Sequence, residues 1–458
     1  MRSLLIILLF LSAIISACRK DERITIDTNA KLTLSKDSIL FDTIFTSIGS
    51  TTRKIKVINK NDDALNISEI KLSGGTLSSF GININGQNTP VKNNIILNGH
   101  DSLNIFVKVT INPDAKNITF LVQDSIIISS NGNRQAIQLL AYGQNAVFIN
   151  NSNINTNTTW TKNLPYIING SVNIKNGSTL SIQPGTKIYF HKDAAMNIEG
   201  TLNVFGTITE PVQFCSDRLE AIYDDEPGQW QGIYFKQTGT GIIKNSIIKN
   251  ASVAITSDSL SVNTNPKIII SNSIIKNMQV AAYIGYHSEL IAFNNLMYNC
   301  GNYIIYAVGG GNYNLKQNTF AGFNPDFPRK TPALTFSDYL STKVFNKLQL
   351  DLVNNIIWGN LTNELDFQKK TNAIVQSNLT NNLIKTSNAN LNTNGNILNS
   401  DPLFASLGTD NFMILSTSPA VKKGINLNSD AYFNAYLTKD LNNKTRLFPS
   451  NLGCYENY

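Results

Sequence analysis

The phrase NSIIKN at residues 245–250 returns unchanged at 272–277, and this repetition decides the fold of the chain. Shortened or altered copies begin 22 to 37 residues apart further along the sequence: NNLMYN at 294–299, QNTFAG at 317–322, NNIIWGN at 354–360 and NNLI at 381–384. A recurrence at such intervals indicates a stacked architecture, because one repeat cannot bury its apolar face without its neighbours.

The composition of each copy favours strands over helices. Its apolar part is only two or three residues long, mostly β-branched or aromatic, which suits a short pleated strand and not a helical turn pattern. Asn on either side suits tight turns, because its side chain bonds nearby backbone and tolerates the left-handed region. If the coils stack in parallel, the Asn side chains of successive copies can also form a hydrogen-bonded ladder.

The stretches before these copies alternate apolar and polar residues between Gly and Pro: 178–190, 194–214 and 228–235. They resemble the right-handed parallel β-helix family of extracellular bacterial proteins, whose architecture pectate-lyase-like enzymes share. The resemblance covers about residue 166 to the C-terminus. It implies a β-helix at 166–400 and end turns with a cap at 401–458, where SDPLF and LGCYE are similar to the family's end segments. That fold hosts lyases, hydrolases, binders and adhesins, so it implies no single activity.

Residues 25–146 have a different pattern, with longer alternating strands such as 53–58 and 102–109 and turn residues between them. This cadence predicts a two-sheet antiparallel β-sandwich. It looks like the immunoglobulin-like modules that precede larger domains in bacterial surface proteins, which implies a spacer or docking role. The Asn- and Thr-rich segment within 147–165 is expected to be a linker. The whole chain is therefore predicted to be all-β.

The N-terminus predicts an exported protein. Arg2, an apolar run at 4–15 that is too short to span a bilayer stably, and the sequence Ile-Ser-Ala-Cys at 15–18 indicate a signal peptide at 1–17. The last four residues resemble the bacterial lipoprotein signal, which implies that Cys18 is lipidated and anchors the chain in a membrane. An ordinary secretory peptide with an incidental cysteine is the alternative.

The tether that follows, 18–24, gives a further expectation about location. Lys20, Asp21 and Glu22 resemble the surface-export signal of some Gram-negative lipoproteins. The resemblance implies an outer-membrane protein, anchored by lipid and facing the cell surface. The alternative is a solvated tether of mixed charge.

Composition excludes several function classes. Charged residues make up 15% of the chain, and the net charge of +7 is dispersed without a run of Lys and Arg, so no nucleic-acid partner is predicted. After Cys18 an odd number of cysteines remains, which excludes complete pairing, and Cys215 and Cys300 are expected to be core residues. The three histidines are far apart, and there is no GxSxG elbow, P-loop or CxxC motif.

One loop concentrates groups that could do chemistry. Between the strand that ends at Phe214 and Cys215 and the strand that begins at Trp230 lie five carboxylates and an arginine: Asp217, Arg218, Glu220, Asp224, Asp225 and Glu226. Such a cluster could bind Ca²⁺ and remove a proton beside a uronate carboxylate, as a polysaccharide lyase requires. The alternative is an insertion that is charged because it is solvated. The lyases' own motifs do not match here residue by residue.

Alternation on the next strand suggests a sugar-binding surface. If Ile233 and Phe235 point inward, Trp230 and Tyr234 would offer flat apolar surfaces beside the acidic loop. Three functions remain open. The first is a surface-anchored binding or adhesion scaffold, with glycans as the expected ligand and no cofactor evident. The others are a polysaccharide lyase or hydrolase using the acidic loop, and a subunit of a surface protein assembly.

Overall fold

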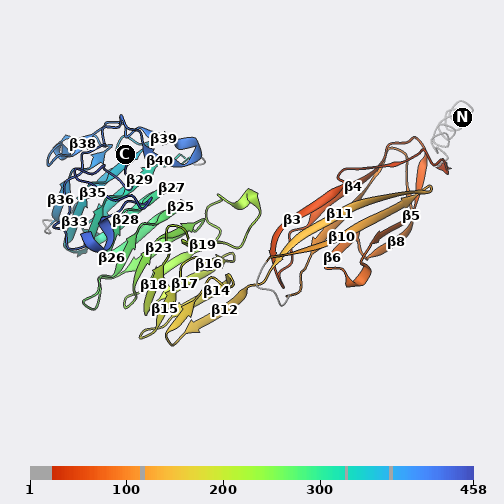
Figure 1. Ribbon diagram of the computed structural model, residues 1–458, viewed down its shortest axis with the longest axis horizontal. Coiled ribbons are helices and arrows are strands. Elements are labelled where there is room, and N and C mark those ends of the chain that lie inside the picture. The colour runs from red at the N-terminus through yellow and green to blue at the C-terminus, as the bar shows by residue number, and fades with distance from the viewer. Residues whose placement is uncertain (1–22, 114–118, 325–327, 371–374, 458) are drawn as a thin grey trace, which may run out of the picture. The chain divides into compact units, whose positions relative to one another are not determined.

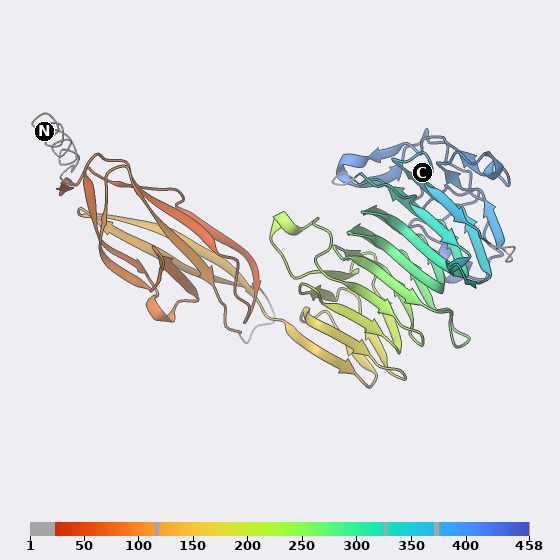
Figure 2. The ribbon, with the colours of Figure 1, turned by 180° about the vertical axis from the view of Figure 1, so that it is seen from behind.

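The computed structural model describes residues 23–113, 119–324, 328–370 and 375–457, and Figures 1 and 2 show it from opposite sides. The chain divides into two compact units, Met1–Asn145 and Ala146–Tyr458, and each has its own hydrophobic core. Both consist almost wholly of strands, so the predicted all-β fold, an antiparallel region before a parallel coil, is confirmed. Within the described residues no helix is long and apolar enough to cross a membrane.

Two sheets with a shared core form the N-terminal unit, coloured red to orange in Figure 1. The larger sheet contains β1 (Ile24–Thr25), β5 (Ala64–Leu72), β10 (Phe120–Ser130), β11 (Asn133–Gln144) and β3 (Ser38–Phe45), with β8 (Val91–Leu97) beside β5. The smaller sheet contains β2 (Leu32–Leu34), β4 (Arg53–Asn59), β9 (Ser102–Val109), β6 (Phe80–Ile84) and β7 (Gln87–Asn88). Most neighbours are antiparallel, and alternate residues such as Ile55 and Val57 are fully buried, as the period of two requires.

The C-terminal unit is a parallel β-helix in which 25 strands stack along three faces. Face 1 contains the first halves of β12 (Val147–Ile154) and β14 (Tyr166–Ile174), then β16 (Lys187–Phe190), β19 (Val212–Ser216), β22 (Ser246–Lys249), β25 (Ile274–Met278), β27 (Leu296–Cys300), β29 (Thr319–Gly322), β34 (Ile356–Gly359), β37 (Leu383–Ile384) and β38 (Ile397–Leu398).

Face 2 contains the second halves of β12 and β14, then β17 (Ala195–Ile198), β20 (Gly232–Phe235), β23 (Val253–Asp258), the first halves of β26 (Ala281–Phe293) and β28 (Tyr303–Lys316), β30 (Leu334–Ser337) and β35 (Leu365–Gln368). Face 3 contains β13 (Thr158–Trp160), β15 (Thr179–Ile182), β18 (Thr201–Phe205), β21 (Thr240–Lys244), β24 (Ile268–Ser271), the second halves of β26 and β28, β33 (Leu348–Val353) and β36 (Val375–Thr380).

The segment 147–165 is not the linker that its composition predicts. It forms β12 and β13, which pair with β14 and β15 and supply the first coil of the β-helix. Ile154 and Trp160 point into the core, whereas the polar residues between them face outward. Alternation in register, and not average composition, determined its structure.

The repeated Asn residues form both the corners and the ladder that the sequence predicts. The first residue of each copy, such as Asn245, Asn272 or Asn354, has a positive φ of 49 to 59° at the corner between faces 3 and 1. The second residue points inward. Asn295 donates to Oδ1 of Asn318 at 3.0 Å, and the same bond repeats through Asn355, Asn382 and Asn396.

The sequence predicts end turns and a cap at residues 401–458. Residues 401–457, which we call the C-terminal strap, run back along the side of the coil. The strap contains β39 (Phe404–Ser406), β40 (Asn411–Ile414) and the short π-helix η5 (Phe433–Leu437). Its Leu437 packs with Phe293 on face 3, and its Phe412 packs with Leu296 on face 1. Those faces carry apolar residues on their outer surfaces, which the strap removes from water.

Candidate functional site

The acidic loop, residues 217–229, projects from the corner between faces 1 and 2, where it joins β19 to β20 (yellow-green in Figure 2). At its start, Asp217 is almost buried and lies 2.7 Å from Nδ1 of the half-exposed His191. Burial raises the pKa of the Asp217 carboxyl, although the hydrogen bond with His191 opposes the rise. Asp217, paired with His191 from the turn after β16, is the carboxyl of the loop that is best placed to exchange a proton.

The next charged residues pair with each other. Arg218 donates from Nε to Oε2 of Glu220 at 3.2 Å, and its guanidinium lies 3.8 Å from the ring centre of Tyr223. Burial lowers the pKa of Arg218, but the hydrogen bonds to Glu220 and Tyr223 outweigh it and leave the pKa above its ordinary value. The arginine therefore holds the loop's own chain together.

Asp224 and Asp225, at the tip, bind the outer surface of face 1. Asp224 pairs with Lys249, and Asp225 accepts hydrogen bonds from Lys276 at 3.3 Å and from Asn277 at 2.8 Å. Burial raises the pKa of Asp225, but Lys276 and the hydrogen bonds to its carboxylate outweigh this and lower it. Such exposed ion pairs stabilise a structure by about 0 to 1 kcal/mol each, so they hold the loop only weakly.

The carboxylates do not converge on one point. Each of the four carboxylates from Asp217 to Asp225 has a different nitrogen partner. In the described part of the chain, no group of three or more His, Cys, Asp or Glu side chains could hold a metal ion. Glu226 is exposed at the end of the loop. A calcium ion here stays a prediction, and binding it would require Asp224 and Asp225 to leave their lysines.

Trp230 does not form the exposed sugar platform that strand alternation predicts. It is 1% exposed, lies parallel to Phe190 with ring centres 4.0 Å apart, and donates from Nε1 to the Lys249 carbonyl at 2.9 Å. Ile233 and Phe235 do point inward, and Tyr234 does point outward. The prediction for Trp230 failed because the chain enters β20 through a turn, Gly232 having φ of +134°, and alternation starts only after that turn.

Tyr234 belongs to a larger group on the outer surface of face 2. The pairing register places Tyr234, Thr256, Ile284 and Tyr306 one above another on successive strands. Tyr286 lies two residues along its strand from Ile284 and is 42% exposed.

Tyr303 completes this group, because its ring centre lies 4.5 Å from that of Tyr306. We call Tyr234, Tyr286, Tyr303 and Tyr306 the tyrosine surface. Burial raises the pKa of Tyr306, and the neighbouring Tyr303 and Tyr286 raise it further. Burial also raises the pKa of Tyr234, so the hydroxyls of Tyr234 and Tyr306 stay protonated at neutral pH and can donate hydrogen bonds.

Amide side chains flank the tyrosine surface on two sides. Below it, Asn153, Asn173 and Asn197 form an outer ladder with two hydrogen bonds of 2.9 Å. At the corner of faces 1 and 2, Gln279 and Asn302 help to line a hollow of about 390 Å³ that also includes Asn299, Pro227 and Lys330. Asn302 immediately precedes Tyr303, so the hollow and the tyrosine surface adjoin.

The remaining candidates have no shared site. Cys215, Cys300 and Cys454 are buried and unpaired, and burial raises the pKa of each thiol to about 12. His100 bonds Asp62 in the N-terminal unit, and Nδ1 of His287 lies 2.9 Å from the Gly309 carbonyl in the coil. Cys18, Lys20, Asp21 and Glu22 lie outside the described residues.

Comparison with known proteins supports the fold of the second unit. Residues 152–241 match the family model described as a pectate-lyase-like beta helix domain. The match runs from the end of β12 through all of β20 to the start of β21. No curated protein matches the sequence.

Three solved structures show limited similarity. A family 123 glycoside hydrolase from Clostridium perfringens is 10% identical with a TM-score of 0.21, over 29% of this chain and 30% of that one. The periplasmic chaperone SfaE is 8% identical with a TM-score of 0.17, over 25% and 58% of the two chains. A PapD-like domain of human CEP192 is 11% identical with a TM-score of 0.17, over 28% and 92%. The chain thus spans under a third of the glycoside hydrolase and just over half of the chaperone.

Proposed function

We propose that the protein binds an extended glycan along the outer surface of face 2, with the tyrosine surface as the centre of the site. The observation that carries this proposal is a row of outward residues on parallel strands that contains Tyr234 and Tyr306, with Tyr286 and Tyr303 beside it. Three steps of about 4.8 Å separate the strands of Tyr234 and Tyr306, so the row extends over about 14 Å, which suits several sugar units.

The chemistry of the surface fits sugars. A tyrosine ring offers an apolar face to the C–H groups of a pyranose, and its hydroxyl can bond to the sugar hydroxyls. The amides of the outer ladder and of the adjoining hollow supply donors and acceptors at both ends of the row. The hydrophobic contacts of the C-terminal strap are with faces 1 and 3 in the described residues, and this leaves the tyrosine surface accessible.

Affinity electrophoresis through gels that contain different polysaccharides tests this function. We expect one polymer to retard the wild-type protein and to remain intact, and we expect Tyr286→Ala combined with Tyr306→Ala to abolish the retardation. Tyr142→Ala, a 43% exposed tyrosine in the N-terminal unit, is the matched control and should migrate as wild type. Failure of every polymer to retard the protein would count against glycan binding and would favour a subunit that docks to other proteins.

Cleavage of a polysaccharide at the acidic loop is the second candidate function. The observation that favours it is the pair of His191 and Asp217, in which a half-exposed imidazole touches a carboxyl with a raised pKa. A cleared track in the gel would identify an enzyme. Asp217→Asn should then abolish clearing, whereas Asp224→Asn with Asp225→Asn would test the loop tip and any role of calcium.

We also propose that Cys18 carries the lipid that anchors the protein in an outer membrane, and that Lys20, Asp21 and Glu22 direct it to the cell surface. Radiolabelled palmitate should enter the wild-type protein and not a Cys18→Ala variant. Protease added to intact cells should degrade the wild type, while replacement of Lys20, Asp21 and Glu22 by Ala should protect it. Equal digestion of the wild type and the alanine variant would refute the export signal, but it would not affect the proposal that Cys18 is lipidated.

A further inference from the structure

The outer surface of face 3 carries one column of stacked residues. The C-terminal strap covers the part of this column that is nearer the C-terminal end of the coil, and we call that part the upper part. The pairing register places Phe205, Lys244, Ser271, Phe293 and Lys316 one above another on successive strands. An aromatic residue followed by a lysine thus occurs twice in the column, once under the strap and once below it.

The upper pair shows what the strap supplies. Phe293 is fully buried against two strap tyrosines, with ring centres 5.4 Å from Tyr432 and 5.9 Å from Tyr436. Lys316 is 7% exposed and forms an ion pair with Asp430 of the strap, besides one with Asp351 of its own face at 2.8 Å. An acidic residue and two aromatic residues within the segment 430–436 therefore satisfy the upper pair.

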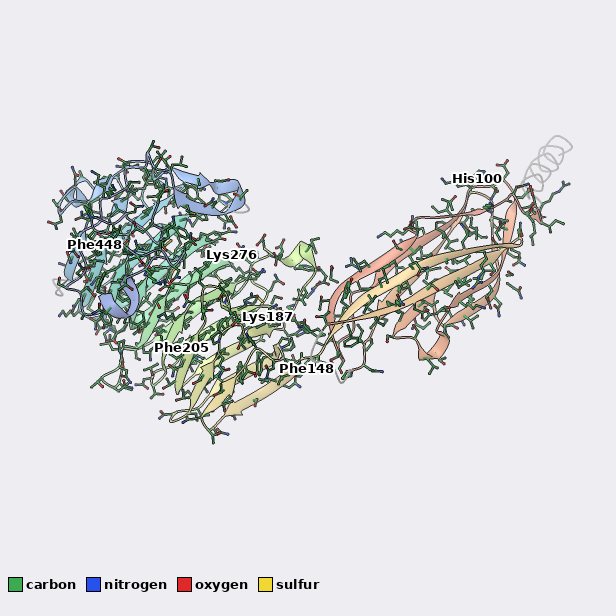
Figure 3. The ribbon with its side chains drawn as sticks, viewed as in Figure 1. His100, Phe148, Lys187, Phe205, Lys276 and Phe448 are labelled. Carbon is green, nitrogen blue, oxygen red and sulfur yellow. The ribbon has the colours of Figure 1, made fainter. Side chains whose placement is uncertain are left out.

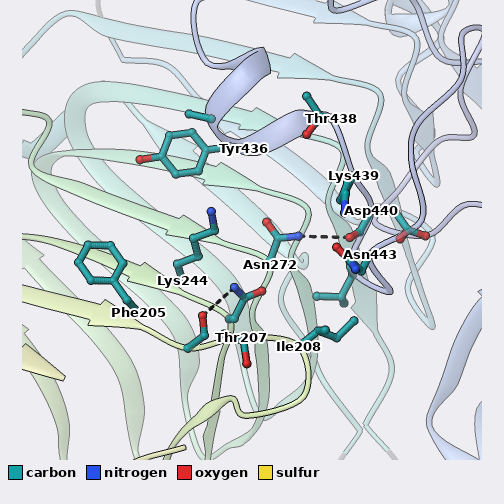
Figure 4. A pocket seen from close by; sticks show the side chains of 14 residues that line it. Phe205, Thr207, Ile208, Lys244, Asn272, Tyr436, Thr438, Lys439, Asp440 and Asn443 are labelled. Atoms are coloured by element: carbon teal, nitrogen blue, oxygen red, sulfur yellow. Dashed lines mark hydrogen bonds between the residues drawn. The ribbon is translucent and has the colours of Figure 1, made fainter. Parts of the chain in front are cut away.

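In the described residues, the lower pair has neither a carboxylate paired with Lys244 nor an aromatic ring packed on Phe205. Phe205 is 45% exposed, and no carboxylate in the described part of the chain lies within ion-pair distance of the Lys244 ammonium. Both residues line a pocket of about 530 Å³ between face 3 and the strap. Figure 4 shows the Lys244 side chain between the rings of Phe205 and Tyr436, and the Lys244 Nζ lies 5.7 Å from the centre of the Tyr436 ring.

The corner beside this pocket is built to bind peptide backbone. Higher in the same corner column, Asn354 donates to the Ile425 carbonyl at 3.1 Å and accepts from the Ile425 N–H at 2.9 Å. One Asn side chain thus bonds both backbone polar groups of one strap residue. Asn245 and Asn272 occupy the equivalent positions at the pocket. Each donates one bond, to the carbonyls of Gly206 and Asp440. Among the described residues nothing donates to their Oδ1 atoms.

We propose that this pocket docks an extended peptide segment of a partner protein, with an acidic residue for Lys244, an aromatic residue for Phe205 and a backbone held by Asn245 and Asn272. The strap is the precedent, since it binds Phe293, Lys316 and Asn354 by the same three means. Charge complementarity and the exposed ring make the segment acidic and aromatic. This docking site is independent of the tyrosine surface, which lies on face 2.

The test uses a fluorescent peptide with the sequence NSDAYFNAYL, which is that of strap residues 428–437. Fluorescence anisotropy with the full-length protein should show saturable binding. Phe205→Ala and Lys244→Gln should each weaken it about tenfold or more, as should Asp→Asn in the peptide, because a charged hydrogen bond or a buried ring is lost. Lys244→Glu should bind poorly, and a peptide with Lys in place of Asp should restore its binding.

Matched controls exist on face 1, where Phe148 and Lys187 are exposed on β12 and β16 (Figure 3). Phe148→Ala and Lys187→Gln should bind the peptide as wild type does. The proposal is overturned if the wild type does not bind, if the controls weaken binding as much as the pocket variants do, or if the pocket variants bind normally because the peptide has displaced the strap at Phe293. Retardation by an acidic polysaccharide that depends on Lys244, with no peptide binding, would likewise overturn it and make the pocket a glycan site.

Discussion

Neighbouring asparagines in the repeated phrase have opposite roles. In Asn354-Asn355, the first residue adopts the left-handed conformation and points its amide outward to the strap, and the second points inward to the ladder. Buried amides are costly unless they are bonded. Asn318, Asn355 and Asn382 each bond the ladder Asn above and below as well as a backbone carbonyl. The ladder thus fixes the register between coils.

Replacement of one ladder residue should therefore destabilise the protein strongly. Asn318→Ala removes bonds to the Ala292 carbonyl and to Asn295 and Asn355, and the buried backbone N–H of Asn295 loses Asn318 Oδ1, to which it donates at 3.0 Å. We expect a loss of about 3 kcal/mol or more in the free energy of unfolding, measured by urea denaturation. Asn390→Ala, at an exposed position, is the control and should stay within about 0.5 kcal/mol of wild type. Equal stability of both variants would refute the role of the ladder.

Lys267 gives a pH dependence. Its side chain is fully buried, its Nζ donates to the carbonyls of Lys236 and Gln237, and burial lowers its pKa to about 8. Because the unfolded chain keeps this proton up to about pH 10.4, the unfolded state binds more protons between pH 8 and 10. Stability from this group therefore rises with pH across that range.

Comparison with Lys267→Met isolates this effect, since the tyrosines that ionise at high pH are common to both proteins. Between pH 7.5 and 9.5 the wild type should gain about 1 to 2 kcal/mol relative to the variant, measured from urea unfolding curves at both pH values. Parallel pH profiles for the two proteins would show that Lys267 titrates normally in the folded state.

At the scale of elements, two aromatic residues close together in the sequence, one before β20 and one within it, have different roles. Trp230 packs on Phe190 beneath the loop, whereas Tyr234, four residues later, lies on the outer surface of face 2. The buried ring belongs to the core and the outward ring to the proposed site.

Alanine variants of these two rings should behave differently. Trp230→Ala should cost about 3 to 5 kcal/mol of stability, because it leaves a cavity beside Phe190 and frees the Lys249 carbonyl. Tyr234→Ala should change the stability little and weaken retardation by the polysaccharide. Thermal denaturation followed by affinity electrophoresis checks both. If the Trp230→Ala protein is as stable as wild type but no longer binds the polysaccharide, Trp230 belongs to the binding surface and not to the core.

At the scale of the molecule, the strap completes the core of the second unit. It covers apolar side chains on the outer surfaces of faces 1 and 3, such as Phe293, Leu296 and Ile356. A buried polar contact attaches it, since Arg446, which pairs with Glu456 within the strap, donates to Oδ1 of Asn294 in the coil at 2.7 Å. A buried pair of this kind is costly to break from one side.

Removal of residues 401–458 should therefore expose a large apolar surface. We expect the truncated chain to bind the dye ANS and to aggregate. Removal of the N-terminal unit up to Asn145 is the control, because that unit has its own core, and it should leave the β-helix folded and soluble. A monomeric truncated chain that does not bind the dye would show that the strap is dispensable.

The repeated phrase by itself determined the all-β coil, its corners and the Asn ladder, because these depend on local backbone preference and on a period that the sequence displays. Tertiary structure alone decided the rest. Composition made 147–165 look like a linker, but pairing with β14 and β15 made it a coil. The tyrosine surface depends on which of Tyr283 and Tyr286 faces outward. The pocket at Phe205 depends on how much of face 3 is covered by a strap that lies some 200 residues later in the sequence. Register and long-range packing set such features, and no local sequence pattern encodes them.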